Sequence, residues 1–106
     1  MAFPRYEKPK DPNEILDYNI DWAERLDGDT IATSVFSIVT PVDGILILGN
    51  GSNLGGAQHG PSNTPSTTTF WLGGGTEAVT YTILNRITTA AGRTMDQSVR
   101  LRIKSK

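Results

Sequence analysis

The chain has 106 residues, no cysteine and a formal net charge of −1 at pH 7. This length suits a single domain that buries about 60 to 65% of the surface exposed by its unfolded chain. The absence of cysteine excludes disulfides, thiolate metal ligands and cysteine nucleophiles. The near-neutral charge gives no field that attracts nucleic acid or an acidic membrane, and no apolar run has the length of a membrane span. We therefore expect neither nucleic acid nor a membrane as a partner.

The first residues, MAFPRYEKPKDP, predict an extended arm. Charges and prolines stand where a signal peptide needs an apolar run, so we expect synthesis in a cytoplasm. Three prolines within residues 1–13 disfavour a helix and favour extended backbone. We assign residues 1–13 to an N-terminal arm and residues 14–106 to a folded domain.

The arm carries two aromatic side chains, Phe3 and Tyr6, which a fully solvated tail has little reason to hold. We expect residues 1–11 to be disordered in the isolated domain and to become ordered by docking these two rings on a neighbouring subunit or another protein. The alternative is that Phe3 folds back over a sheet edge of its own domain.

A strand with one solvated face is predicted after the arm. In LDYNIDW, residues 16–22, apolar and polar side chains alternate, which is typical of a half-buried strand. The order D-x-N-x-D also matches the start of a calcium loop, but Trp22 stands where that loop requires glycine. Gly28 stands where it requires a bidentate glutamate. A strand is therefore favoured, and we expect no metal site here.

Charge is distributed unevenly along the chain. Residues 11–29 contain seven acidic side chains and one basic one, whereas residues 86–106 contain six basic side chains and one acidic one. Exposed ion pairs contribute only about 0.2 to 1 kcal/mol each, but they favour one registry over another. From this complementarity we expect the strand with Asp17 and Asp21 to lie beside the last strand of the domain.

Two more strands and a long loop are predicted in the neutral middle of the chain. The apolar positions of TIATSVFSIV, residues 30–39, change parity around Val35 and Phe36, which indicates a bulge or a change of sheet. Pro41 ends this segment, and GILILG, residues 44–49, is the next short strand.

The loop runs from Gly49 to Pro65 and begins with GNGSN, which is similar to a phosphate-binding turn. Its third glycine, however, is displaced to Gly55, and no helix can follow, because Gly60 and Pro61 lie among serine, threonine and asparagine. A helix N-terminus is what would hold a pyrophosphate. We expect a loop that binds no nucleotide cofactor and is mobile in the free protein.

The C-terminal half predicts strands joined by glycine-containing turns. TTTFWL, residues 67–72, precedes three glycines, and a turn at Gly92 joins two alternating segments into a hairpin. Tyr81 stands where an immunoglobulin-like domain has its tyrosine corner, although an ordinary core tyrosine fits as well. Short strands at regular spacing and no convincing helix predict an all-β fold, an antiparallel β-sandwich with the extended N-terminal arm, and a tyrosine corner at Tyr81 would make this sandwich immunoglobulin-like.

Trp71 and Asn85 are the unusual residues of this half. Phe70 and Leu72 share one face of their strand, so Trp71 takes the other and is presented outward unless a second layer covers it. An exposed tryptophan is typical of protein interfaces and of sugar stacking; the alternative is a core residue. Parity places Asn85 inward, where we interpret it as a clamp on neighbouring backbone.

Catalysis is poorly supported by the sequence. His59 is the only histidine and lies in the long loop, and the chain contains no G-x-S-x-G elbow. Carboxylate pairs exist, but a domain of this size has few residues to build a cleft around them. We expect no enzyme activity, no catalytic residues, no cofactor and no metal.

Two blocks of the sequence resemble a known family of small virion proteins. They are KDPNEILDYNIDWAERLDGDTIATSVFSI, residues 10–38, and WLGGGTEAVTYTILNRITTAAGRTMDQSVRLRI, residues 71–103, and together they cover more than half of the chain. Their most specific elements are D-P-N-E, D-W followed by L-x-G-D-T-I, and N-R-I-T-T-x-x-G-R-T-x-D. Both blocks are similar to the fibre-tail adaptors of tailed bacteriophages.

This resemblance implies a virion structural protein with an immunoglobulin-like domain, which joins tail or baseplate to fibre through protein contacts and without catalysis. Its partners would be other virion proteins, such as the tail tube, the baseplate hub or the fibre, with several copies in a symmetric assembly. It would be made in the host cytoplasm and located in the phage tail. The candidate partner-binding residues are Phe3, Tyr6 and Trp71. The alternative is a carbohydrate-binding or adhesion β-sandwich that uses Trp71 and Tyr6 as stacking platforms.

Overall fold

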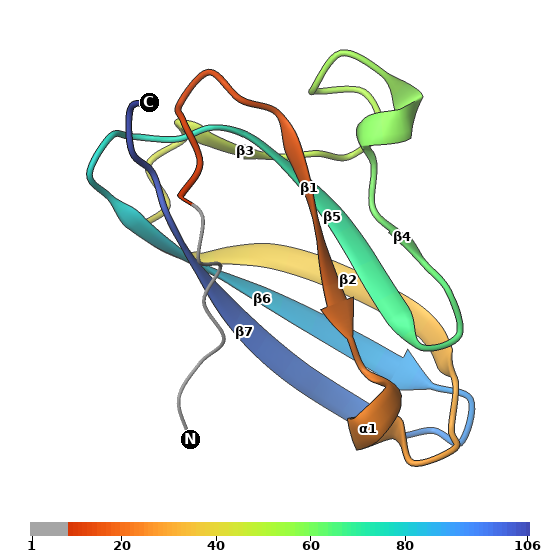
Figure 1. Cartoon of the computed structure of the whole chain (residues 1–106). Helices are drawn as coiled ribbons and strands as arrows, with labels where there is room; N and C mark the ends of the chain where they lie inside the picture. Colours follow the sequence, from red (N-terminus) through yellow and green to blue (C-terminus); the bar gives the residue numbers. More distant parts are fainter. Residues whose placement is uncertain (1–8) are drawn as a thin grey trace.

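The structure is a computed structural model, and it describes residues 9–106 as two antiparallel β-sheets that face each other (Figure 1). The elements are, in chain order, β1 (Leu16–Asp21), α1 (Ala23–Leu26), β2 (Ile31–Thr40), β3 (Leu46–Leu48), the 3-10 turn η1 (Ala57–His59), β4 (Ser62–Asn63), β5 (Thr67–Gly74), β6 (Thr80–Thr89) and β7 (Thr94–Arg102). One sheet has the order β1-β5-β3, with β4 also paired to β5, and the other has the order β2-β6-β7. The prediction of an all-β antiparallel sandwich is confirmed.

The alternating segment at residues 16–22 forms β1 and the residue after it. Tyr18, Ile20 and Trp22 are buried, and the polar residues between them are exposed. The single helical turn α1, which follows at once, departs from the expectation of strands alone. It places Leu26 in the core at 1% exposure.

The prediction that the first strand lies beside the last strand is wrong. β1 pairs with β5, whereas β7 pairs with β6, so the two strands lie in different sheets. Burial of apolar faces decides the pairing, because exposed ion pairs contribute too little free energy to compete with it. The opposite charges of the chain ends meet outside the strands instead, where Lys106 Nζ lies 3.0 Å from Glu14 Oε1 and the Lys106 backbone N–H donates to Asp11 Oδ2 at 2.8 Å.

β2 contains register shifts, but neither lies at Val35 and Phe36, where the sequence predicted one. The register of β2 against β6 shifts between Ile31 and Thr33 and again between Ile38 and Thr40. The first shift allows Ile31 and Phe36 to pack on the same core although their positions differ in parity. β2 therefore stays within one sheet along its whole length.

A buried hydrogen-bond network around Asn85 of β6 joins the two sheets. Asn85 Oδ1 accepts from Thr68 Oγ1 of β5 at 2.6 Å and from Trp22 Nε1 at 3.1 Å. Asn85 Nδ2 donates to Ser34 Oγ at 2.9 Å and to the Val35 carbonyl at 3.1 Å, both in β2. The interpretation of Asn85 as a clamp on neighbouring backbone is confirmed.

The apolar core is built from both sheets. Besides Trp22, its members include Tyr18, Ile20, Leu26, Phe70, Leu72, Tyr81, Ile83, Ile87, Val99, Leu101 and Ile103. Phe70 has no exposed surface, and its ring stacks on Tyr18 at 5.5 Å and meets Phe36 at 4.9 Å between centroids. These aromatic pairs add specific contacts between β5, β1 and β2 to the area that is buried.

Tyr81 forms the tyrosine corner, which was one of the two alternatives that the sequence left open. Its hydroxyl accepts from the backbone N–H of Thr76, five residues upstream, at 2.8 Å. The same hydroxyl donates to Asp43 Oδ2 at 2.5 Å, and Thr76 Oγ1 donates to this oxygen at 2.9 Å. The hydrogen bond from Tyr81, with that from the Ile45 backbone, lowers the pKa of Asp43 to about 2. The corner thus holds the β2–β3 connection against the β5–β6 turn.

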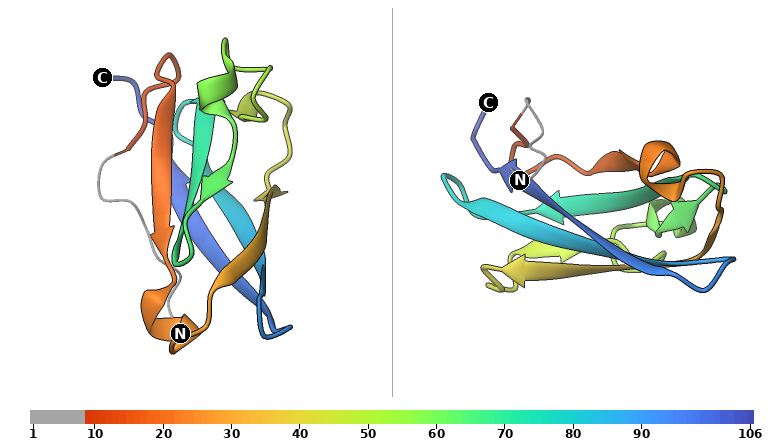
Figure 2. Two further views of the ribbon diagram at one scale, coloured as in Figure 1. Left: turned by 90° about the vertical axis from the view of Figure 1, so that its right-hand side faces the viewer. Right: turned by 90° about the horizontal axis from the view of Figure 1, so that it is seen from below.

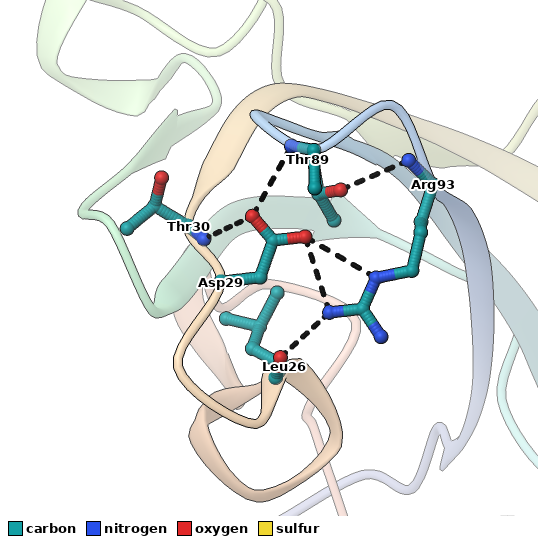
Figure 3. Close-up of polar contacts among 6 residues, drawn as sticks. Leu26, Asp29, Thr30, Thr89 and Arg93 are labelled. Carbon is teal, nitrogen blue, oxygen red and sulfur yellow. Dashed lines mark hydrogen bonds and ion pairs between the residues drawn. The ribbon is translucent and has the colours of Figure 1, made fainter.

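Asp29 and Arg93 form an ion pair at the end of the sandwich where α1 meets the β6–β7 turn (Figure 3). Arg93 Nη2 lies 3.1 Å from Asp29 Oδ2 and donates to the Leu26 carbonyl at 2.6 Å. The Asp29 side chain is only 10% exposed. Hydrogen bonds from the Thr89 hydroxyl, the Thr30 backbone N–H and the Arg93 guanidinium lower the pKa of Asp29 to about 2. This pair ties the connection between the sheets to the hairpin.

Replacing Asn85 by alanine is expected to lower the free energy of unfolding by about 1 to 3 kcal/mol, because the buried Thr68 hydroxyl loses its acceptor. Urea denaturation followed by tryptophan fluorescence measures the change. Thr88→Ala is the control, because Thr88 is exposed on the same strand and its loss should cost less than about 0.5 kcal/mol. Equal losses in the two variants would contradict the clamp.

Replacing Asp29 by asparagine is expected to lower the melting temperature near neutral pH and to leave it unchanged near pH 2. The pKa of Asp29 in the folded chain is lowered to about 2 from its ordinary value of 3.8, so the carboxylate stabilises the fold above about pH 4 and loses this effect as the pH falls to about 2. Thermal melts from about pH 7 to pH 2 test this, with exposed Asp17→Asn as the control. If the difference in melting temperature between the variant and the parent chain stays constant down to pH 2, the charge of Asp29 is not its cause.

Candidate protein interaction site

Trp71 lies on the outer face of the β1-β5-β3 sheet and is half-buried beneath the loop that follows β3. Its ring centroid is 4.5 Å from that of His59, with the planes tilted by 41°. The Gly49 N–H donates to the Trp71 carbonyl at 2.8 Å. A Cβ atom at Gly49 would lie 2.1 Å from the His59 carbonyl oxygen, so only glycine permits this close approach. Trp71 is therefore neither a core residue nor a freely exposed platform.

The loop from Gly49 to Pro65 is anchored in the structure, where we expected it to be mobile. Leu54 is 8% exposed and packs on Gly73, where a Cβ atom would lie 2.6 Å from Leu54 Cδ2. His59 Nδ1 lies 2.6 Å from the Leu54 carbonyl oxygen, and β4 pairs with β5 near the end of the loop. Backbone pairing and side-chain packing thus give this loop defined contacts with β5, while its mobility in the free protein stays a prediction.

The glycine-rich turn uses its polar groups internally. Asn50 Oδ1 accepts from the backbone N–H groups of Ser52 at 2.9 Å and of Asn53 at 3.1 Å. Asn53 in turn accepts from the Asn50 N–H at 2.9 Å and donates to the Leu48 carbonyl at 3.0 Å. These contacts are those of a self-contained turn after a strand. The backbone N–H groups of Asn50, Ser52 and Asn53 are thus bonded within the turn.

Phe3 and Tyr6, the aromatic residues of the arm, lie outside the described residues. The described chain starts at Pro9, and its Lys10 forms a parallel bridge with Ile103 at the end of β7. The Lys10 N–H donates to the Arg102 carbonyl at 3.0 Å, and the Lys104 N–H donates to the Lys10 carbonyl at 2.8 Å. For Lys10 and Asp11 the expectation of disorder is therefore wrong.

The Lys10 side chain is fully buried, which the sequence did not suggest. Its Nζ donates to the Gly74 carbonyl at 2.6 Å and to the Asp11 carbonyl at 2.8 Å. Burial lowers the pKa of Lys10, and the neighbouring carboxylates of Glu14 and Asp11 oppose this effect. Two carbonyl acceptors thus fix the Lys10 side chain near the start of the described chain.

A shallow apolar groove lies between the middle of β2 and the end of β3. Its volume is about 260 Å³, and it is lined by Ser34, Val35, Phe36, Leu48, Gly49, Asn50 and Pro61. None of these side chains carries a charge, and Val35 is 63% exposed. No sequence motif marked this groove, because it arises only when the edges of two different sheets come together.

Neither a cluster of metal ligands nor a membrane-spanning helix is found in the part of the chain that the structure describes. Within residues 9–106, no three histidine, aspartate or glutamate side chains come together as metal ligands. In the same part of the chain, no helix has the length and apolarity needed to span a membrane. The features that can contact another molecule are the Trp71–His59 surface, the start of the arm and the apolar groove.

The fold defines the class of the protein first. The structure is similar to the solution structure of the PKD domain from KIAA 1837 protein, with a TM-score of 0.53 and 16% sequence identity, covering 100% of this chain and 90% of that one. This likeness shows an immunoglobulin-like β-sandwich and confirms the predicted fold class. No curated protein matches the chain.

The family follows from the sequence of the domain. Residues 10–102 match the family described as podophage GP4 fiber-tail adaptor protein gp77. Because this match covers more than half of the chain, the protein belongs to that family, and the resemblance to phage fibre-tail adaptors is confirmed. The family is one of structural phage adaptors, and the immunoglobulin-like fold agrees with such a role.

Replacing Leu54 by alanine is expected to loosen the loop over Trp71, because Leu54 packs directly on Gly73. Hydrogen–deuterium exchange should become faster for the amides of residues 50–60 and remain unchanged in β6 and β7. Val42→Ala is the control, since Val42 is an apolar side chain with 76% exposure. Unchanged exchange in the loop would show that Leu54 does not hold it.

Proposed function

We propose that this protein is a virion structural component of a tailed bacteriophage and joins the fibre to the tail or baseplate through protein contacts alone. The single observation that carries the proposal is the family match over residues 10–102. Its partners are other virion proteins, and several copies act together in a symmetric assembly at the tail. It has no catalytic role, and the host cytoplasm is where it is made.

The polarity of the domain surface supports a role in assembly. Between Thr30 and Thr76 the only formal charge is that of Asp43, and this carboxylate is engaged by Tyr81 and Thr76. Five large apolar side chains of the described residues are exposed: Ile15, Val35, Val39, Val42 and Ile45. An uncharged surface with exposed valine and isoleucine side chains is suited to burial against another protein.

The arm is the main docking element in this proposal. Lys10 and its two carbonyl acceptors fix the domain end of the arm. Phe3 and Tyr6 are the anchors, and burying each ring on a partner contributes about 1.5 to 3 kcal/mol before ordering costs. Prolines at positions 4 and 9 reduce the entropy that is lost on docking.

Trp71 supplies a secondary contact in the proposal, together with the ring of His59 that packs on it. The same packing weighs against the alternative of a carbohydrate-binding module, because His59 occupies part of the ring surface on which a sugar would stack. Binding of the isolated domain to a glycan array, lost in Trp71→Ala, would favour that alternative over the adaptor.

Deleting residues 1–8 is expected to exclude the protein from phage particles without lowering its melting temperature, because the bridge between Lys10 and Ile103 is retained. Phe3→Ala and Tyr6→Ala should each weaken incorporation roughly tenfold or more, as expected for the loss of about 1.5 kcal/mol or more of burial energy. Quantitative mass spectrometry of purified particles measures the copy number.

Arg5→Ala is the matched control for the arm, since it removes a side chain of similar length without removing an aromatic ring. If the truncated chain melts well below the full chain, the arm belongs to the fold. If it enters particles at the normal copy number, docking by the arm is excluded.

A further inference from the structure

β2 presents an unpaired edge that has a register shift near each end but no charge or proline between them. It pairs with β6 on one side, and among residues 9–106 no strand pairs with its other side, although the Ile31 N–H donates to the Pro65 carbonyl at the start of the strand. Residues 32–40 contain no charge and no proline. Unpaired edges attract further strands, and folded proteins normally shield them with charges, proline or a covering segment.

The opposite edge of the same sheet is shielded. β7 carries Asp96, Arg100 and Arg102, all exposed, and the backbone of Lys10 covers its end. Since the two edges differ in this way within one sheet, β2 is the edge that is suited to accept a strand.

The apolar groove lies directly beside this edge. Ser34, Val35 and Phe36 belong to β2 and line one wall, and Leu48 at the end of β3 belongs to the other. On the opposite face of β2, Val35 and Val39 are 63% and 48% exposed. A strand added along β2 would therefore meet an uncharged groove on its inner face and exposed valines on its outer face.

The position of the chain start identifies the occupant. β1 and the C-terminal end of β7 lie on one side of the sandwich, and β2 and β3 lie on the opposite side (Figures 1 and 2). The described chain starts beside β7, because Lys10 is bonded to Arg102 and Lys104. Eight extended residues reach about 26 Å. Crossing the sheet from β7 to β2 takes about 10 Å of this, which leaves about five residues to pair along β2 of the same chain. A second copy whose β2 edge lies beside β7 of the first leaves all eight residues for this pairing, so the longer contact is the one between two copies.

We propose that residues 1–8 of one copy bind as an added strand along β2 of a second copy. The proposal deepens the proposed function and rests on it, because it names the surface that receives the arm. Donor and acceptor surfaces lie on opposite sides of the domain, so the contact is head-to-tail. Repetition of such a contact closes into a ring when the rotation permits, as a symmetric assembly requires.

The sequence of the arm fixes which side chains enter the groove. Pro4 has no N–H, so Phe3, Arg5 and Glu7 occupy the positions that bond to the β2 edge. Arg5 and Glu7 are charged, so they face solvent on the outer face of the added strand. Because side chains alternate along a strand, Phe3 lies on that same face, against the exposed valines of β2. Pro4 and Tyr6 face the groove, where Ser34 and Asn50 offer polar partners for the Tyr6 hydroxyl.

Photocrosslinking of the full chain tests the proposal. Tyr6 is replaced by p-benzoylphenylalanine, isotopically heavy and light copies are mixed at about 1 mM, and cross-linked peptides are identified by mass spectrometry. Cross-links from position 6 to residues 34–36 or 48–50 should join heavy to light copies. Val35→Lys should reduce their yield about tenfold, because it places a charge on the docking edge. Thr88→Lys, a charge on the exposed face of the central strand β6, should leave the yield unchanged.

Three results would overturn the proposal: cross-links within one copy only, cross-links to another surface, or no cross-link. Incorporation into particles is measured separately. If the Val35→Lys chain enters particles at the normal copy number, the groove is not the receiving surface, while the proposed function stands. If the cross-links form as described but the parent chain is absent from particles, the groove accepts the arm and the adaptor function is wrong.

Discussion

The buried amide of Asn85 is the interaction on which the arrangement of the two sheets depends. A side-chain amide without partners is costly in an apolar core, so its position is tolerated only where donors and acceptors converge on it. Here they come from the end of β1, from β5 and from β2. The contacts with Ser34 and Val35 also hold β2 from inside at the point where it lines the groove. The same network therefore fixes the sandwich and presents the uncharged edge of β2.

The two outer edges of the β2-β6-β7 sheet differ in charge and in how they are covered. β7 is charged, and the segment at Lys10 closes its end, so it is suited to solvent and to holding the arm. β2 is uncharged and exposes valines, and in the described residues no strand is paired to its outer edge. Edge strands without charge are an aggregation hazard unless a partner covers them. A part that is made to assemble with its neighbours can retain such an edge.

The sequence predicted local features well and long-range placement poorly. Alternation identified β1 and the β6–β7 hairpin, and the position of Tyr81 made the tyrosine corner one of two alternatives, because each depends on neighbours along the chain. The pairing of β1 with β5 was missed, since weak exposed charges were the only sequence signal for strand neighbours. No signal in the sequence indicated the burial of Lys10, because its acceptor at Gly74 lies 64 residues away. The register shifts of β2 depend on its partner β6, so apolar parity alone misplaced them.

Gly49, the first glycine of the turn that resembles a phosphate-binding loop, has a packing role instead. Gly49 allows the loop to lie against Trp71, and Gly73 receives Leu54, so a loop with few apolar residues is held close to the outer face of the sheet. This loop covers part of the face that would otherwise expose Trp71. Its end at Asn50 and Pro61 also forms the far wall of the groove beside β2. Covering part of one surface and shaping another are thus two consequences of the same close backbone approach.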